Sequence, residues 1–121
     1  MNEKIRWKIT DPLGNEVCLK ESTYIEHILK DHSPQDSAYR MQIEREARIT
    51  ILTPSLIVSD GERNLYYKVI GLTGENLKIR MLKVVVEKNR NPQEVVTWTI
   101  LRKGDNVKGD VIYGHVPCKE I

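Results

Sequence analysis

The chain has 121 residues, enough for one domain with a hydrophobic core and too few to expect two. Apolar residues make up 40% and charged residues 30%, which excludes wholesale disorder and is ordinary for a soluble globular protein. No apolar run approaches the roughly 18 residues of a membrane span and the first residues lack the apolar region of a signal peptide, so we expect a cytoplasmic protein without membrane partners. The formal charge of +2 neither requires nor excludes a polyanionic partner.

The first stretch of the chain is predicted to form a β-hairpin. Apolar and basic residues alternate over residues 4–9, the period of two expected when one strand face is buried. Proline and glycine mark a turn over 11–15, and residues 16–19 alternate again. The basic residues of the first strand could follow a phosphate backbone, but exposed strands often carry charge against edge-to-edge pairing, and we favour this second interpretation.

A short helix is predicted next. Thr23 with Glu26 three residues later matches a capping box, so the helix should begin near Tyr24. Pro34 forbids its continuation, and we expect it to end near Asp31. Its apolar stripe is formed by Ile25, Ile28 and Leu29.

A second helix should follow, with Asp36 or Ser37 as its cap and Pro54 as its stop. Apolar residues recur at helical spacing along it. They are Tyr39, Ile43, Ala47 and Ile51.

The rest of the chain is predicted to form strands. Residues 56–58 and 64–70 read as a second hairpin. Residues 77–87 are expected to form the central strand, because three consecutive valines near its end indicate burial on both faces. Residues 94–101 should pair antiparallel with it, and 111–113 should add a short edge strand. The expected fold class is α+β, with an N-terminal hairpin, two helices, and a four- to five-stranded antiparallel sheet covered by the helices on one side.

Several short motifs within these elements resemble one known superfamily. They are His27-Ile28-x-x-x-His32-x-Pro34, Ile51-Leu52-x-Pro54, Tyr66-Tyr67-Lys68, Val84-Val85-Val86 and Val96-Thr97-Trp98-Thr99. Together they resemble the nuclease domains of phages and mobile elements in the barnase, EndoU, colicin and RelE-like (BECR) superfamily. The resemblance covers residues 20–102 of a single domain, 1–121, with 1–19 as an N-terminal hairpin and 103–121 as a C-terminal loop and tail.

The resemblance implies a metal-independent ribonuclease or toxin-like nuclease, without a cofactor, that acts on RNA and has a neutralising protein partner. It implies a site on the sheet with a histidine from the first helix, a cation from the central strand and hydroxyls from the next strand. The catalytic candidates are His27, His32, Arg80, Lys83, Thr97 and Thr99. The substrate-binding candidates are Tyr67 and Lys68.

These residue types suit metal-free RNA cleavage. The reaction needs a base for the ribose 2′-hydroxyl, an acid for the leaving oxygen, and fixed positive charge for the developing phosphorane. His27 and His32 suit the proton transfers because the unperturbed histidine pKa is about 6.5. Thr97 and Thr99 are expected to share one strand face, and Val96, Trp98 and Ile100 the other.

Each candidate also has a structural interpretation. His27 could bond Asp31 four residues on, and His32 could be a cation at the helix C-terminus. The two threonines could be β-favouring residues on a wet face. Tyr67 and its neighbour Tyr66 point to opposite faces, so at most one of them can stack on a base. Arg80 and Lys83 also lie on opposite sides of their strand, which weakens the nuclease interpretation.

Two alternatives stay open beside the nuclease. His115-x-x-Cys118 has zinc-ligand spacing, with His27, His32 and Cys18 available to complete a tetrahedron. Five residues turn an α-helix through roughly 140°, so the two helix histidines should diverge, and we do not expect a metal site. The second alternative is a non-catalytic α+β module that binds a protein or nucleic-acid partner. It predicts that His27 and the strand cation share no cleft.

Overall fold

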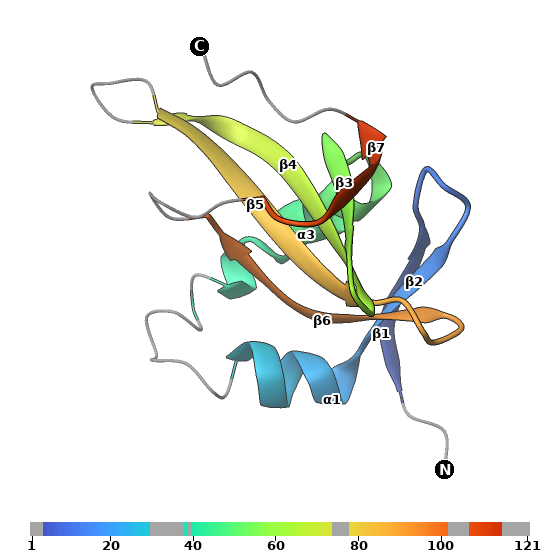
Figure 1. Cartoon of the computed structure of the whole chain (residues 1–121). Coiled ribbons are helices and arrows are strands. Elements are labelled where there is room, and N and C mark those ends of the chain that lie inside the picture. Colours follow the sequence, from blue (N-terminus) through green and yellow to red (C-terminus); the bar gives the residue numbers. More distant parts are fainter. Residues whose placement is uncertain (1–3, 30–37, 39, 74–77, 102–106, 115–121) are drawn as a thin grey trace.

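The computed structural model of the chain describes residues 4–29, 38, 40–73, 78–101 and 107–114, with the side chains of 70–73 and 78–80 left aside. This part of the chain forms a seven-stranded sheet and several helical segments (Figure 1). The strands are β1 (Ile5–Thr10), β2 (Glu16–Lys20), β3 (Leu56–Asp60), β4 (Arg63–Thr73), β5 (Lys78–Glu87), β6 (Gln93–Ile100) and β7 (Asp110–Gly114). The helices are α1 (Glu21–Thr23), which continues directly into η1 (Tyr24–Leu29), and α3 (Glu44–Leu52). Residues 38 and 40–42 are also helical.

The α+β class is confirmed, and the make-up of the sheet differs from the expectation. The strand order is β1-β2-β6-β5-β4-β3-β7, which places β5 at the centre and β7 at an edge, as predicted. The N-terminal hairpin is part of the same sheet, because β2 pairs in parallel with β6 through Val17↔Gln93 and Cys18↔Glu94. All other neighbouring strands pair antiparallel. The prediction of four to five antiparallel strands was wrong because pairing of segments about 75 residues apart leaves no local pattern in the sequence.

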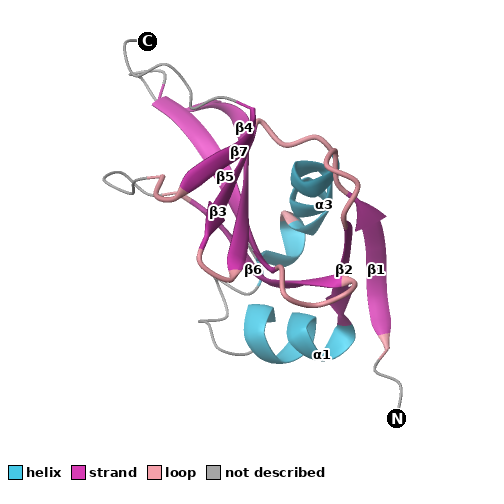
Figure 2. Ribbon diagram, turned by 45° about the vertical axis from the view of Figure 1, so that its right-hand side comes forward, coloured by secondary structure: helices cyan, strands magenta, loops and turns pink. Residues whose placement is uncertain are grey.

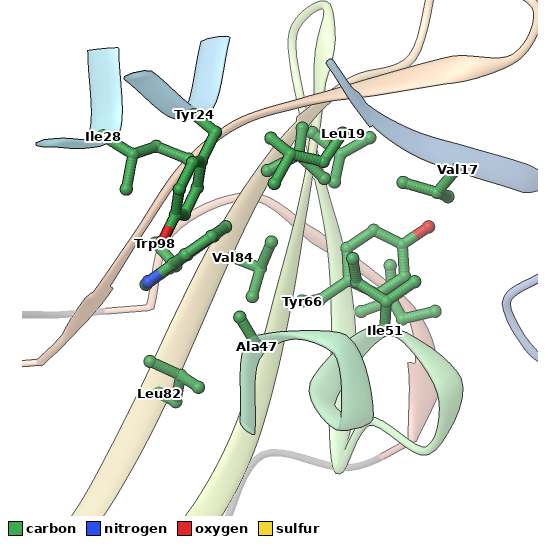
Figure 3. Packing of buried hydrophobic residues seen from close by; sticks show 13 residues of the cluster. Val17, Leu19, Tyr24, Ile28, Ala47, Ile51, Tyr66, Leu82, Val84 and Trp98 are labelled. Carbon is green, nitrogen blue, oxygen red and sulfur yellow. The ribbon is translucent and has the colours of Figure 1, made fainter. Parts of the chain in front are cut away.

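Both faces of the sheet carry buried apolar side chains. The helix-side cluster takes residues from the strands and from both helical segments (Figure 3): Val17, Leu19, Tyr24, Ile28, Ala47, Ile51, Ile57, Tyr66, Leu82, Val84, Val86, Val95 and Trp98. The outer cluster lies on the opposite face and consists of Leu56, Val58, Leu65, Tyr67 and Val85. Figure 2 shows α3 between the β1–β2 hairpin and strand β4, on the inner side of the curved sheet, and α1 below β6. The valine run of β5 therefore serves both faces, as its sequence predicted.

The first helical segment differs from its prediction in two ways. It begins at Glu21, and no side chain caps it at Lys20, so the expected start near Tyr24 with a Thr23–Glu26 capping box was wrong. The stretch Tyr24–Leu29 is a π-helix, whose i→i+5 hydrogen bonds give a wider turn than an α-helix. Tyr24 and Ile28 are buried, while Ile25, expected in the apolar stripe, is 54% exposed.

The α3 helix follows its predicted stripe and stop. Ala47 and Ile51 are buried in the helix-side cluster, Ile43 packs against it, and the helix ends at Leu52, two residues before Pro54. Asp36, Ser37 and Tyr39 lie outside the described residues. Within these residues, no helix has the length and apolar character needed to cross a membrane.

One strand face was assigned incorrectly. Val96 was expected beside Trp98, but it packs against the outer cluster while Trp98 lies in the helix-side cluster. The cause is a register shift in the β5–β6 ladder, where Val85 pairs with Thr97 and Val86 pairs with Val95. A bulge of this kind inserts one residue and breaks the alternation of side chains.

Candidate functional site

An open groove of 720 Å³ lies beside β6, at the point where β2 ends and the first helix begins. We call it the His27 groove. Its lining is mostly polar: Lys20, Ser22, Thr23, Glu26, His27, Glu87, Arg90 and Glu94, with Val95 and Val96. The parallel pairing of Cys18 with Glu94 creates this site, because it places the end of β2 and the start of the helix against β6. The groove thus depends on the part of the fold that local sequence patterns did not predict.

His27 contributes an exposed imidazole to this groove. It belongs to η1, whose neighbouring residues Tyr24 and Ile28 anchor the segment in the helix-side cluster. Glu26 beside it is also exposed and lines the same groove. Short π-helical segments are rare in proteins and are frequent at functional sites. His27 is therefore a titratable side chain on a firmly packed element of an unusual geometry.

The charge of the groove centres on Glu94. Its Oε1 lies 3.1 Å from Lys20 Nζ, and its Oε2 lies 3.5 Å from Arg90 Nη1. Lys20 is the last residue of β2, and Arg90 stands in the turn between β5 and β6, so the two cations come from different elements. The side chains of Lys20 and Glu94 are 23% and 20% exposed, and that of Arg90 is 62% exposed. The two cations therefore share one carboxylate, with Arg90 facing solvent and Lys20 mostly buried.

Three of the strand candidates do not join His27: they are Lys83, Thr97 and Thr99. Lys83 pairs with Tyr67 on one side and with Thr99 on the other, and residues opposite each other in a ladder share a face. Because Tyr67 belongs to the outer cluster, Lys83 and Thr99 project from the face opposite the helices. Thr97 Oγ1 accepts a hydrogen bond of 2.7 Å from Arg40 Nη1. None of these side chains lines the His27 groove.

The two substrate-binding candidates have structural contacts instead. Tyr67 is 1% exposed in the outer cluster, so its ring offers no free face to a base. Tyr66 is fully buried on the other side of the sheet, which confirms that the two tyrosines point to opposite faces. Lys68 Nζ donates to the carbonyl oxygen of Thr53 at 2.7 Å, just after the last residue of α3. A cation at this position satisfies a carbonyl at the helix C-terminus.

Other candidates fall outside the described part of the chain. His32, which was predicted to assist His27, and the side chain of Arg80 both lie outside the described residues. His115 and Cys118 of the zinc alternative also lie there. Within the described residues, no three His, Cys, Asp or Glu side chains are grouped so as to hold a metal ion.

Sequence reasoning missed Lys20, Arg90 and Glu94 as site residues. Glu94 and Lys20 are 74 positions apart, and neither belongs to a motif with a chemical role. The spacing of Arg90 and Glu94, four residues apart across a turn, was the one local signal. Comparison with models of known protein families, with curated proteins and with solved structures gives no match to this chain.

Proposed function

We propose that this chain is a metal-independent ribonuclease domain of BECR type, of phage or mobile-element character and cytoplasmic, with the His27 groove as its site. The observation that carries the proposal is an exposed histidine on a π-helical segment, in an open groove that also holds Lys20 and Arg90. The motif resemblance over residues 20–102 supports it, and the α+β class agrees with what that resemblance implies. The same resemblance implies a neutralising protein partner.

The groove offers the groups that the reaction needs. In the proposed step, the ribose 2′-oxygen bonds to phosphorus as a base takes its proton, and the bond from phosphorus to the 5′-oxygen breaks as an acid supplies one. His27 acts as the acid or the base, with His32 assisting as the motif suggests, and Glu26 is a further titratable side chain of the groove. Lys20 and Arg90 stabilise the negative charge that develops on phosphate, in place of the strand cation first expected.

Cleavage of mixed cellular RNA in the presence of EDTA tests the proposal. We expect the protein to cleave RNA, and His27→Ala to lower the rate by about 10²–10⁴-fold, the usual contribution of one general acid or base. The midpoint of thermal unfolding should stay nearly unchanged because the imidazole is exposed. Gln42→Ala, which alters an exposed polar residue outside the groove, is the matched control and should keep full activity. Absence of cleavage, or cleavage that EDTA abolishes, contradicts the proposal.

A non-catalytic binding module is the second candidate. The observation in its favour is that Lys83 and Thr99 project from the face opposite His27, so these candidates share no cleft. On this proposal the groove binds its partner but catalyses no reaction. A mobility-shift assay with single-stranded RNA tests this candidate. Binding of the RNA without cleavage supports the binding module and contradicts the nuclease.

A further inference from the structure

The pair of cations around Glu94 has the arrangement of a phosphate site. Lys20 faces one carboxylate oxygen at 3.1 Å and Arg90 faces the other at 3.5 Å. A phosphodiester also presents two anionic oxygens on one central atom, so it can make the same two contacts. The three side chains line the His27 groove, so an incoming phosphate would approach the cations in the same space that Glu94 occupies.

The two ion pairs of Glu94 differ in exposure. Arg90 is 62% exposed, so its pair with Glu94 typically contributes about 0–1 kcal/mol to stability and is easily exchanged. The side chains of Lys20 and Glu94 are 23% and 20% exposed, so the ammonium of Lys20 needs an anion beside it, and an incoming phosphate replaces the carboxylate in that role. The β2–β6 pairing through Val17 and Cys18 is formed by the backbone and does not depend on these charges.

We propose that Lys20 and Arg90 form the position that binds a backbone phosphate of single-stranded RNA, and that Glu94 is an internal stand-in which this phosphate displaces. The inference rests on the proposed function only in placing RNA in the groove; it does not require His27 to be catalytic. No aromatic side chain lines the groove among the described residues. Recognition therefore goes through the backbone, with little preference for particular bases.

The test measures binding of a fluorescent, fully 2′-O-methylated oligouridylate, which lacks the 2′-hydroxyl and cannot be cleaved by this chemistry. Glu94→Gln removes the competing charge and should tighten binding by about tenfold at low salt. The slope of the logarithm of the binding constant against the logarithm of salt concentration should steepen by about 0.7 for each additional phosphate that the protein neutralises. Glu16→Gln is the matched control, because Glu16 carries the same charge, pairs with Lys8 at 3.6 Å and lies outside the groove. The control should change affinity by less than about twofold, since a distant surface charge is screened.

Two further variants tie the tighter binding to the two cations. Adding Lys20→Gln or Arg90→Gln to Glu94→Gln should remove most of the increase in affinity, because one of the cations that bind the phosphate is then missing. Arg90→Gln alone keeps the test informative should Glu94→Gln fold poorly, since Arg90 is a mostly exposed turn residue. It should weaken binding about fivefold relative to Arg45→Gln, which removes an exposed arginine of α3 outside the groove.

The outcomes separate this inference from the proposed function. The phosphate position is overturned if Glu94→Gln binds no more tightly than Glu16→Gln, or if the increase in affinity survives the loss of either Lys20 or Arg90. If either of these results is obtained while RNA cleavage still depends on His27, the proposed nuclease function is supported and only the phosphate position is rejected. Tighter binding by Glu94→Gln in a protein that never cleaves RNA supports the phosphate position within a binding module.

Discussion

At the scale of single residues, Asp11 is a buried acid with several hydrogen-bond donors. The residue is 4% exposed, and its carboxylate accepts hydrogen bonds from Leu13 N at 2.9 Å, from Asn15 N at 2.8 Å and from Asn15 Nδ2 at 3.2 Å. The hydroxyl of Tyr66, which is buried in the helix-side cluster, donates a fourth. A buried carboxylate is tolerated because its oxygens are bonded. Burial, and then the hydrogen bond to Asp11, raises the pKa of Tyr66 well above its usual range.

Tyr66→Phe should lower the free energy of unfolding by about 1.5–3 kcal/mol, the usual contribution of a hydrogen bond to a charged group. The variant keeps the ring in the core, so the loss reports the hydroxyl rather than packing. Chemical denaturation at neutral pH measures it. Tyr67→Phe is the matched control: it deletes the same atom in the outer cluster, where no hydrogen bond of that hydroxyl is found among the described residues, and it should cost less. Equal losses for the two variants would contradict the role of Asp11.

Tyr66 also makes the free energy of unfolding depend on pH in the alkaline range. Tyr66 keeps its proton in the folded state at pH values where the unfolded chain, with a tyrosine pKa of about 10, has lost it. The unfolded state then binds fewer protons, so stability falls as pH rises above about 10. The fall should be shallower in Tyr66→Phe, and an unchanged slope would count against the raised pKa.

At the scale of elements, β7 is an exposed edge strand attached by a close backbone approach. All five of its residues are exposed, and it pairs antiparallel with β3 from Leu56↔Gly114 to Ser59↔Asp110. Gly114 has φ +77°, and a Cβ built on it would lie 2.1 Å from the carbonyl oxygen of Ser55. A side chain at this position would therefore push β7 away from β3.

Gly114→Ala should detach the end of β7 without unfolding the rest of the molecule. Because β7 buries little side-chain surface, the effect is expected as local opening rather than a large global loss. Amide hydrogen exchange of Val111 to Tyr113 should accelerate by more than about tenfold, while Val84 in β5 keeps its protection. Gly14→Ala is the control: φ is +88° there but nothing lies within 4 Å of the built Cβ, so it carries only the backbone cost of about 1–2 kcal/mol. Unchanged exchange in β7 would show that the contact can relax.

At the scale of the whole molecule, Glu44 joins the helices to the first strand. Its carboxylate accepts hydrogen bonds from Arg6 Nε at 2.5 Å, Arg6 Nη2 at 2.9 Å and Trp7 Nε1 at 2.9 Å. The Arg6 guanidinium also lies 3.8 Å from the centre of the Tyr24 ring, a cation–π contact. One cluster thus links β1, η1 and α3. The hydrogen bonds from Arg6 hold the pKa of Glu44 below its usual range.

Glu44→Gln should destabilise the protein by about 1–3 kcal/mol at neutral pH, because charge-assisted hydrogen bonds are lost. The folded-state pKa lies below the ordinary value of 4.5, so the contribution of Glu44 is complete above that pH and is lost as pH falls through the folded pKa. Unfolding free energy measured from neutral pH down to below 4.5 should therefore decline less steeply in the variant. Glu16→Gln, whose pair with Lys8 is half exposed, should change stability by less than about 0.5 kcal/mol and keep the steep decline. A variant with the same acid dependence as the parent would exclude Glu44 as its source.

Most of the elements, and several of their buried faces, could be predicted from the amino-acid sequence alone. The consecutive valines of β5 and the Ala47–Ile51 spacing of α3 follow from a period that a single strand or helix must obey. The alternation in β1 was correct for the half-buried Trp7 and Ile9, but Ile5 is exposed, beside a register shift in the β1–β2 ladder. The edge position of β7 and the opposite faces of Tyr66 and Tyr67 were predicted for the same reason. His27 was predicted as a candidate from its residue type and from the motif resemblance, and the structure places it in the groove.

Where these elements meet could not be predicted from local patterns. The parallel β2–β6 pair joins segments about 75 residues apart, and it brings Lys20 to Glu94. The bulge at Val96 and the π-helical turn at Tyr24–Leu29 are departures from regular geometry that a strict period of two or 3.6 does not show. Local periodicity specifies which side of a strand or helix is buried, but not which strands pair or in what register, because pairing free energy comes from long-range partners.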